Sequence, residues 1–251
     1  MRQLLPLARD ARLDDLYAGL TLPVASSTDC WVAVGMISSL DGAASHEGRS
    51  GALGDEADRL AISRLRDATD AVLVGAATVR AEGYGPLTAT ATRRADRRAR
   101  GLAEIPRLAI LTASGRLAAE AGVFSDPRQR PLVLTTTTGA RRATATLGER
   151  AEVVALGDDV VAPRTALAAL AERGLGRVLC EGGPRVTAQL LGEDLVDEMF
   201  LTHAPVVVAG DEARIAQSAG TRVLRRQRLV SVWEHDGALF LRYRHPRHEP
   251  V

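Results

Sequence analysis

The stretch that most constrains the fold is residues 176–209, GRVLCEGGPRVTAQLLGEDLVDEMFLTHAPVVVA. Its pattern predicts a strand, a glycine turn, a helix and a second strand. The short run Arg177–Cys180 ends at Gly182 and Gly183, which allow backbone torsions that are closed to other residues. Pro184 suits the first turn of a helix, because it has no N–H group to leave unpaired there.

A glycine turn that opens a helix is a natural anion site. Free N–H groups and the helix dipole both favour a phosphate at that position. The alternative is a tight strand-to-helix turn without a ligand, because an isolated glycine pattern is a weak signal. The residues of this turn leave both interpretations open.

The remaining chain alternates apolar strand-like runs with amphipathic segments. This alternation predicts an α/β fold with a mostly parallel central sheet flanked by helices. Asp236 and Gly237 separate two alternating runs and predict an antiparallel C-terminal hairpin. We expect a single domain over residues 30–246, preceded by a peripheral segment, 1–29, and followed by a tail, 247–251.

Composition narrows the class of protein. The net charge is +1, which argues against a general binder of nucleic acid or membrane surfaces, because such binding needs a basic excess. The arginine-rich segment 93–100 is interpreted as a solvated surface. Cys30 and Cys180 are expected to be reduced, buried thiols. The N-terminus lacks the pattern of a signal peptide, and no apolar run approaches the ~20 residues of a membrane span, so we expect a cytoplasmic protein.

Several well-known catalytic motifs are missing from the sequence. It has no G-x-S-x-G, no H-E-x-x-H, no Walker motif and no G-x-G-x-x-G. The five histidines have no metal-ligand spacing, so no metal site is expected. Ligands of open α/β sheets lie beyond the carboxyl ends of the strands. We therefore expect the loops 38–54, 75–87 and 181–187 to line one cleft.

Four polar residues, three on these loops and one on the predicted helix 55–67, have two interpretations each. Asp41 either caps its turn or places a carboxylate at the cleft, where it holds a polar ring or relays a proton. Arg66 either complements a helix dipole or grips a phosphate. Thr78 and Glu82 are either cap and solvent positions or ligand contacts. The residues alone predict an α/β domain with a phosphate-bearing ligand.

Four segments resemble a known family in their order and spacing. They are Ser38–Gly42 (SSLDG), Arg64–Glu82 followed by YGPL, Val178–Leu191 (VLCEGGPRVTAQLL) and Leu195–Gly210 (LVDEMFLTHAPVVVAG). Together they resemble the C-terminal reductase domain of bacterial riboflavin-biosynthesis enzymes and the stand-alone pyrimidine reductases of that family. The resemblance covers roughly residues 31–243 and implies a dihydrofolate reductase-like fold.

The resemblance also implies roles for individual residues. It implies NADPH contacts, with the pyrophosphate wrapped by the glycine turn, at Ser38, Ala52, Thr78, Glu82, Gly182, Gly183, Pro184, Arg185, Val186 and Thr187. It implies that Ser50, Arg66 and Glu181 hold the ribosyl phosphate or its sugar, and that Asp41 is an acid near the substrate.

The implied reaction is the reduction of a ribosylamino-pyrimidine 5′-phosphate to its ribitylamino form, with hydride delivered to C1′ of the ring-opened imine. The family also implies a homodimer. The sequence departs from the fused bacterial enzymes at Glu82–Pro86, where those enzymes have Asp-Asp-Pro, and at Ala52, where an aromatic residue is common. The deaminase motif of the fused enzymes is absent from this sequence.

Two other functions fit the same residues. One is a dihydrofolate-type reductase, or a reductase of another small heterocycle, since a fold and a cofactor do not fix the substrate. The other is a non-catalytic protein that senses NADPH. Turnover distinguishes an enzyme from a sensor.

Overall fold

The computed structural model describes residues 1–24, 29–220 and 222–248. The chain divides into two compact units. The first contains Met1–Thr21, Val32–Leu65 and Cys180–Val251, and the second contains Leu22–Trp31 and Arg66–Leu179. Parts of the predicted segment 1–29 and tail 247–251, namely 25–28 and 249–251, lie outside the described residues. The single domain over residues 30–246 stays a prediction.

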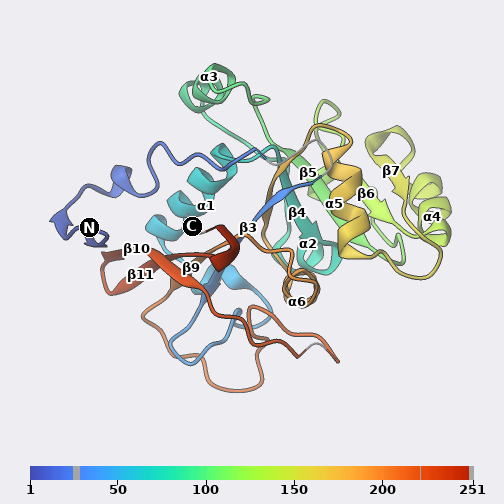
Figure 1. Cartoon of the computed structure of the whole chain (residues 1–251). Helices are drawn as coiled ribbons and strands as arrows, with labels where there is room; N and C mark the ends of the chain where they lie inside the picture. The colour runs from blue at the N-terminus through green and yellow to red at the C-terminus, as the bar shows by residue number, and fades with distance from the viewer. Residues whose placement is uncertain (25–28, 221, 249–251) are drawn as a thin grey trace. The chain divides into compact units, whose positions relative to one another are not determined.

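The first unit is built on a largely antiparallel sheet in the order β2-β1-β10-β11-β9-β3. β3 and β9 are parallel, and the other neighbouring pairs are antiparallel. The bounds are Arg2–Leu5 (β1), Arg9–Asp10 (β2), Trp31–Ser38 (β3), Glu198–His203 (β9), Arg228–His235 (β10) and Ala238–Arg244 (β11). The first residue of β3, Trp31, is assigned to the second unit. β9, β10 and β11 run side by side in Figure 1. The helices α1 (Glu56–Asp67) and α6 (Pro184–Gly192) also belong to this unit, apart from the last two residues of α1.

The predicted C-terminal hairpin is confirmed as β10 and β11. Asp236 and Gly237 lie between the strands with φ angles of 48° and 82°. A two-residue hairpin turn with both central φ angles positive matches the twist of the strands, and Asp-Gly is among the few pairs that adopt it readily.

The second unit is built on a parallel sheet in the order β8-β4-β5-β6-β7. β4, β5, β6 and β7 are parallel to one another. Every residue of β4 and β6 is buried, as expected for strands covered on both faces. The strand bounds are Ala71–Gly75 (β4), Arg107–Thr112 (β5), Leu132–Thr135 (β6), Glu152–Ala155 (β7) and Arg177–Cys180 (β8). The helices are α2 (Ala76–Glu82), α3 (Ala91–Ala99), α4 (Thr137–Leu147) and α5 (Pro163–Ala171).

The interpretation of segment 93–100 as a solvated surface is wrong for Arg97. The segment lies mostly in α3, and Arg97 is fully buried. Its guanidinium donates to the carbonyl oxygens of Arg66 (2.6 Å), Thr69 (2.9 Å) and Ala103 (2.7 Å). Burial lowers the pKa of Arg97 to about 10, so it remains charged at neutral pH. The guanidinium therefore supplies donors to one carbonyl group in the last turn of α1 and to two carbonyl groups beyond that helix.

Arg93 reinforces the same contact. Its Nε and Nη2 donate to the two carboxylate oxygens of Asp67 at 2.6 and 2.8 Å. Arg100 donates to the carbonyl oxygen of Asp67 at 2.8 Å. The basic face of α3 thus binds the last turn of α1 and the residues that follow it.

Cys30 and Cys180 are both buried free thiols, as predicted. Burial raises the pKa of Cys180 to about 11, so this thiol is protonated and unreactive at neutral pH. Within the described part of the chain, no helix combines the length and the apolar character needed to cross a membrane.

Candidate active site

The glycine turn that was predicted from the sequence lies between β8 and α6. Gly183 is the N-cap residue of α6, and Pro184 is its first residue. As a glycine, Gly183 has no side chain with which to cap this helix end. The first-turn N–H groups of a helix have no partner within the helix, and an anion satisfies them. The backbone here therefore fits a pyrophosphate or phosphate group.

The backbone conformation at Gly182 favours glycine, and the space beside it is tight. Its φ angle is +88°, in the region that favours glycine, and an added Cβ would lie 3.1 Å from the sulfur of Met36 on β3. The peptide bond between Gly182 and Gly183 is cis. The short distance to Met36 places Gly182 beside β3.

The other residues of this turn point in different directions. Arg185 is exposed, whereas Val186 is buried. Thr187 is fully buried, and its hydroxyl donates to the Gly183 carbonyl oxygen at 3.4 Å. Glu181 is buried at the end of β8. Arg185 is the exposed residue of this segment, and Gly183 and Pro184 are half-buried.

Asp41 anchors a neighbouring loop. Its carboxylate accepts hydrogen bonds from Ser39 Oγ (2.5 Å), Val208 N (3.2 Å) and Ala209 N (2.8 Å). These bonds, that of Ser39 first, lower its pKa to about 2. At neutral pH Asp41 is an ionised acceptor, which is a poor proton donor.

Ser38 and the helical turn Ser50–Ala52 lie near the same end of β3. Ser38 is the last residue of the strand and is buried. Ser50 and Ala52 form a 3-10 turn, in which Ser50 is half-buried and Ala52 exposed. Leu53, which follows that turn, packs with Ile37, Ala204 and Val208. This packing brings the turn to the loop that Asp41 anchors.

Three predicted site residues belong to the second unit. Arg66 follows the first unit's part of α1 and is half-buried, and its carbonyl oxygen accepts from Arg97. Thr78 and Glu82 lie on α2, directly after β4, and both are half-buried. Gly83 ends this helix in the left-handed conformation, with a φ angle of 64°.

The sequence interpretation gave no role to two polar residues of the first unit. His203 ends β9 beside Ser38, and its Nδ1 is 3.2 Å from Ser38 Oγ. Asp58 lies in the first turn of α1, where burial raises its pKa and a hydrogen bond with Thr202 partly offsets that rise. The only available signal for His203 was its position at the end of a strand. Asp58 had none, because its burial depends on β9.

Asp41 and Asp58 therefore have opposite electrostatic environments. Hydrogen bonds hold the pKa of Asp41 low, and desolvation holds the pKa of Asp58 above its ordinary value. Among the residues that the model describes, no group of three or more His, Cys, Asp or Glu side chains could hold a metal ion.

Comparison with known proteins identifies relatives over most of the chain. The family model described as "RibD C-terminal domain" matches residues 30–240. The 2,5-diamino-6-ribosylamino-4(3H)-pyrimidinone 5′-phosphate reductase of Archaeoglobus fulgidus is 28% identical over 184 residues, which cover 73% of this chain and 84% of the relative.

Solved structures agree with this assignment. A pyrimidine reductase-like protein from Corynebacterium diphtheriae superposes with a TM-score of 0.81 at 27% identity, covering 92% of this chain and 97% of that one. A dihydrofolate reductase from Enterococcus faecalis, at 14% identity, superposes with a TM-score of 0.51 over 86% of this chain and 96% of its own. The second likeness concerns the fold alone and confirms the predicted dihydrofolate reductase-like architecture.

Proposed function

Because the chain belongs to the RibD C-terminal domain family, we propose that it reduces a ribosylamino-pyrimidine 5′-phosphate to the ribitylamino form in riboflavin biosynthesis. The observation that carries this proposal is the uncapped start of α6 behind Gly182 and Gly183, which lies inside the matched range. The name of the Archaeoglobus fulgidus relative supports the substrate class and the reductase activity.

We propose NADPH as the cofactor. The first turn of α6 fits its pyrophosphate, because the donors there have no side-chain cap and the exposed Arg185 adds a positive charge. Gly182 keeps the turn against Met36. The predicted contacts at Ser38, Ala52, Thr78 and Glu82 remain part of this proposal. When bound, the cofactor supplies hydride, and the residues around it orient both reactants and exclude water.

The substrate contacts are proposed as follows. Arg66 holds the phosphate, since a guanidinium can donate two parallel hydrogen bonds to phosphate oxygens. Ser50 is a hydroxyl partner for the same group. Glu181 is better suited to sugar hydroxyl groups than to phosphate, because two negative charges repel and its carboxylate is buried. Asp41 stays ionised and positions the loop at Val208 and Ala209.

We also propose that the protein acts in the cytoplasm as a homodimer. Closed two-fold dimers are the commonest soluble assembly, and the net charge of +1 provides no attraction to nucleic acid or to an anionic membrane. Sedimentation of the purified protein would test the dimer.

The function is tested by following NADPH absorbance with three substrates in parallel. These are the diamino-ribosylamino-pyrimidinone phosphate, its deaminated uracil counterpart and dihydrofolate. Consumption with either ribosylamino compound supports the proposal and identifies the preferred substrate. Consumption of NADPH with dihydrofolate alone would contradict the proposed substrate. If NADPH binds but is not consumed with any of the three compounds, the protein would be a sensor of NADPH and not an enzyme.

A further inference from the structure

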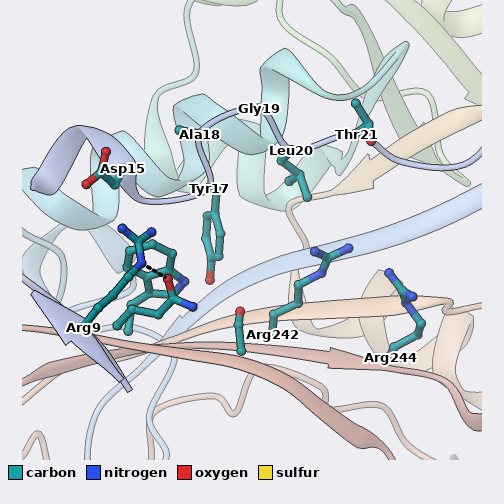
Figure 2. A pocket seen from close by; sticks show the side chains of 12 residues that line it. Arg9, Asp15, Tyr17, Ala18, Gly19, Leu20, Thr21, Arg242 and Arg244 are labelled. Atoms are coloured by element: carbon teal, nitrogen blue, oxygen red, sulfur yellow. Dashed lines mark hydrogen bonds between the residues drawn. The ribbon is translucent and has the colours of Figure 1, made fainter. Parts of the chain in front are cut away.

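A pocket lies in the first unit, and none of the predicted site residues lines it. Its volume is about 570 Å³, and three arginines, Arg9, Arg242 and Arg244, line it together with Tyr17 and Trp233 (Figure 2). The sheet strands form its floor, and residues 15–21 of the N-terminal segment form its opposite wall.

The strand register explains why these side chains share one face. Arg9 lies opposite Gln3, and Gln3 lies opposite Trp233. Ser231 lies opposite Arg242 in the next strand pair. Residues directly opposite each other in antiparallel strands project to the same side of the sheet. Three successive strand pairings therefore bring Arg9 and Arg242 to the same face.

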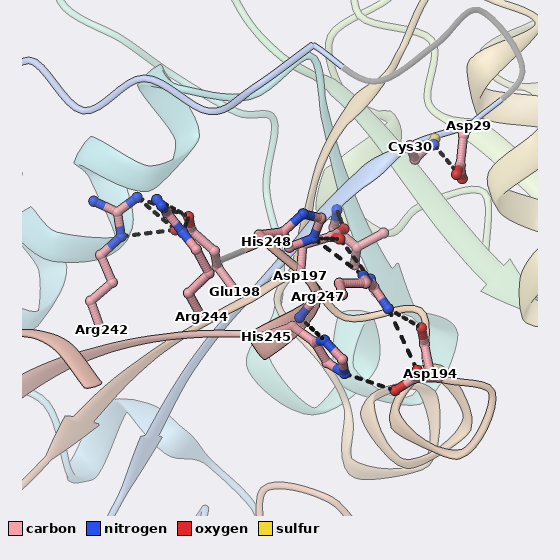
Figure 3. Close-up of polar contacts among 11 residues, drawn as sticks. Asp29, Cys30, Asp194, Asp197, Glu198, Arg242, Arg244, His245, Arg247 and His248 are labelled. Carbon is pink, nitrogen blue, oxygen red and sulfur yellow. Dashed lines mark hydrogen bonds and ion pairs between the residues drawn. The ribbon is translucent and has the colours of Figure 1, made fainter. Parts of the chain in front are cut away.

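Arg242 and Arg244 are held together by a buried carboxylate. Glu198 on β9 is fully buried and accepts from Arg242 Nε and Nη2 at 2.8 and 2.9 Å, and from Arg244 Nε at 2.7 Å (Figure 3). Glu198 offsets one of the two positive charges and fixes both guanidinium groups. Arg242 donates its hydrogen bonds to Glu198 from Nε and Nη2. Among the described residues no acceptor for its Nη1 group is seen, so this group can donate to a ligand.

Arg9, on β2, is the third arginine that lines the pocket. Its Nε donates to Gln3 Oε1 at 2.9 Å, and its guanidinium lies 5.6 Å from the centre of the Trp233 ring. Stacking on an aromatic face holds a guanidinium while leaving its edge free for an anion. The three arginines carry three positive charges, and Glu198 and the pocket residue Asp15 carry two negative charges. The net charge of this group is therefore +1.

Within the first unit, Arg244 of this pocket and the predicted contact Ser38 lie near opposite ends of the parallel strands β3 and β9. Glu198, which holds Arg244, is opposite Ala33 near the start of β3, whereas Ser38 is opposite His203 where both strands end. Five residues of strand separate the two positions, which corresponds to roughly 16 Å. A ligand in this pocket would therefore lie apart from the predicted contact at Ser38.

We propose that this pocket is an anion site for a small molecule that bears a phosphate group. Guanidinium groups match phosphate in charge and in planar, two-pronged geometry. The volume falls in the range of roughly 300–1,000 Å³ that is typical of small-molecule pockets. A phosphate group would balance the excess positive charge and accept from the remaining guanidinium N–H groups.

The test is calorimetric titration of the protein with inorganic phosphate and with pyrophosphate. Arg9→Ala should weaken binding about tenfold or more, because it removes a charged hydrogen-bond donor. Arg12→Ala is the matched control, since it removes the same charge from an exposed side chain outside the pocket. Arg66→Ala removes the proposed substrate phosphate site but should leave unchanged the affinity of the binding event that Arg9→Ala weakens, which separates the two sites.

Two further variants distinguish a loss of phosphate binding from a loss of folding. Arg242→Lys retains a charge beside Glu198 but loses the planar fork, so it should weaken phosphate binding while the circular dichroism spectrum stays native. In Trp31→Phe the only tryptophan is Trp233, and its fluorescence should change on titration. Equal affinities of the wild type, Arg9→Ala and Arg12→Ala would overturn the proposal. So would binding that is lost only in Arg66→Ala, or the absence of saturable binding.

Discussion

At the residue scale, the environment of each carboxyl group decides its chemistry. Asp41 follows a strand in the sequence, and the sequence left open whether it caps a turn or exchanges protons. In the structure it accepts three hydrogen bonds, two of them from a loop about 170 residues further along the chain. These contacts favour the structural role, because they stabilise the charged form.

The titration of Asp41 is a direct prediction. Its folded pKa lies below the unfolded value, so its contribution to stability is present above the unfolded pKa and is lost as the pH falls through about 2. Carboxyl carbon NMR should show a midpoint near 2. Ser39→Ala should raise that midpoint, because the Ser39 hydroxyl is the largest cause of the shift. Ser45→Ala, which removes a hydroxyl bonded to Glu212 instead, should leave it unchanged. A midpoint near 4 in the wild type would contradict this account.

Arg66 tests the proposed substrate contact. Arg66→Ala should raise KM for a phosphorylated substrate by about 10²-fold, since a hydrogen bond to a charged group contributes about 1.5–3 kcal/mol. The control is Arg59→Ala, which removes an exposed arginine from the same helix. Steady-state kinetics with both variants decides the matter, and an unchanged KM in Arg66→Ala would remove Arg66 from the phosphate site.

At the element scale, α3 positions the C-terminal end of α1. The sequence of α3 is rich in arginine, which is usual for a solvated helix face. Instead, Arg97 is buried among the carbonyl groups of Arg66, Thr69 and Ala103. The hydrogen bond from Arg97 to the Arg66 carbonyl oxygen links α3 to Arg66, the residue that we propose binds the substrate phosphate.

Arg97→Met should lower the free energy of unfolding by about 3 kcal/mol or more, because it leaves three carbonyl groups without their donor. Arg94→Met is the control on the same helix. The Arg94 side chain is 45% exposed, and its Nε is 3.8 Å from Glu104, so its loss should change stability by less than about 1 kcal/mol. Urea titrations of both variants would measure the difference. Equal effects would show that the buried hydrogen bonds contribute little.

At the scale of the whole molecule, the chain passes repeatedly between two compact units. The first unit contains three separate segments of sequence and the second contains two. Neither unit is one continuous stretch of chain. This connectivity favours folding as one cooperative domain, in keeping with the prediction made for residues 30–246.

The two tryptophans allow this prediction to be tested. Trp31 belongs to the second unit and Trp233 to the first. Trp233→Phe leaves a fluorescence probe of the second unit, and Trp31→Phe leaves a probe of the first. If the chain is one domain, the fluorescence and circular dichroism of each variant should give the same denaturant midpoint. Separate transitions within either variant would instead identify two domains.

The sequence by itself determined the local elements and the family. Gly182 and Gly183 specify a turn that few other residues can adopt, Pro184 starts the helix after it, and Asp236 with Gly237 forms the predicted hairpin turn. These features depend on backbone torsions of neighbouring residues, so they can be read directly from the chain.

Only the tertiary structure decided which polar groups are buried and which partners they meet. Arginine and glutamate are residue types that usually lie on the surface, yet Arg97 and Glu198 are both fully buried. The N-terminal segment, expected to be peripheral, supplies Arg9 and one wall of the basic pocket. Burial and long-range hydrogen bonds depend on elements far apart in the sequence, which no local pattern records.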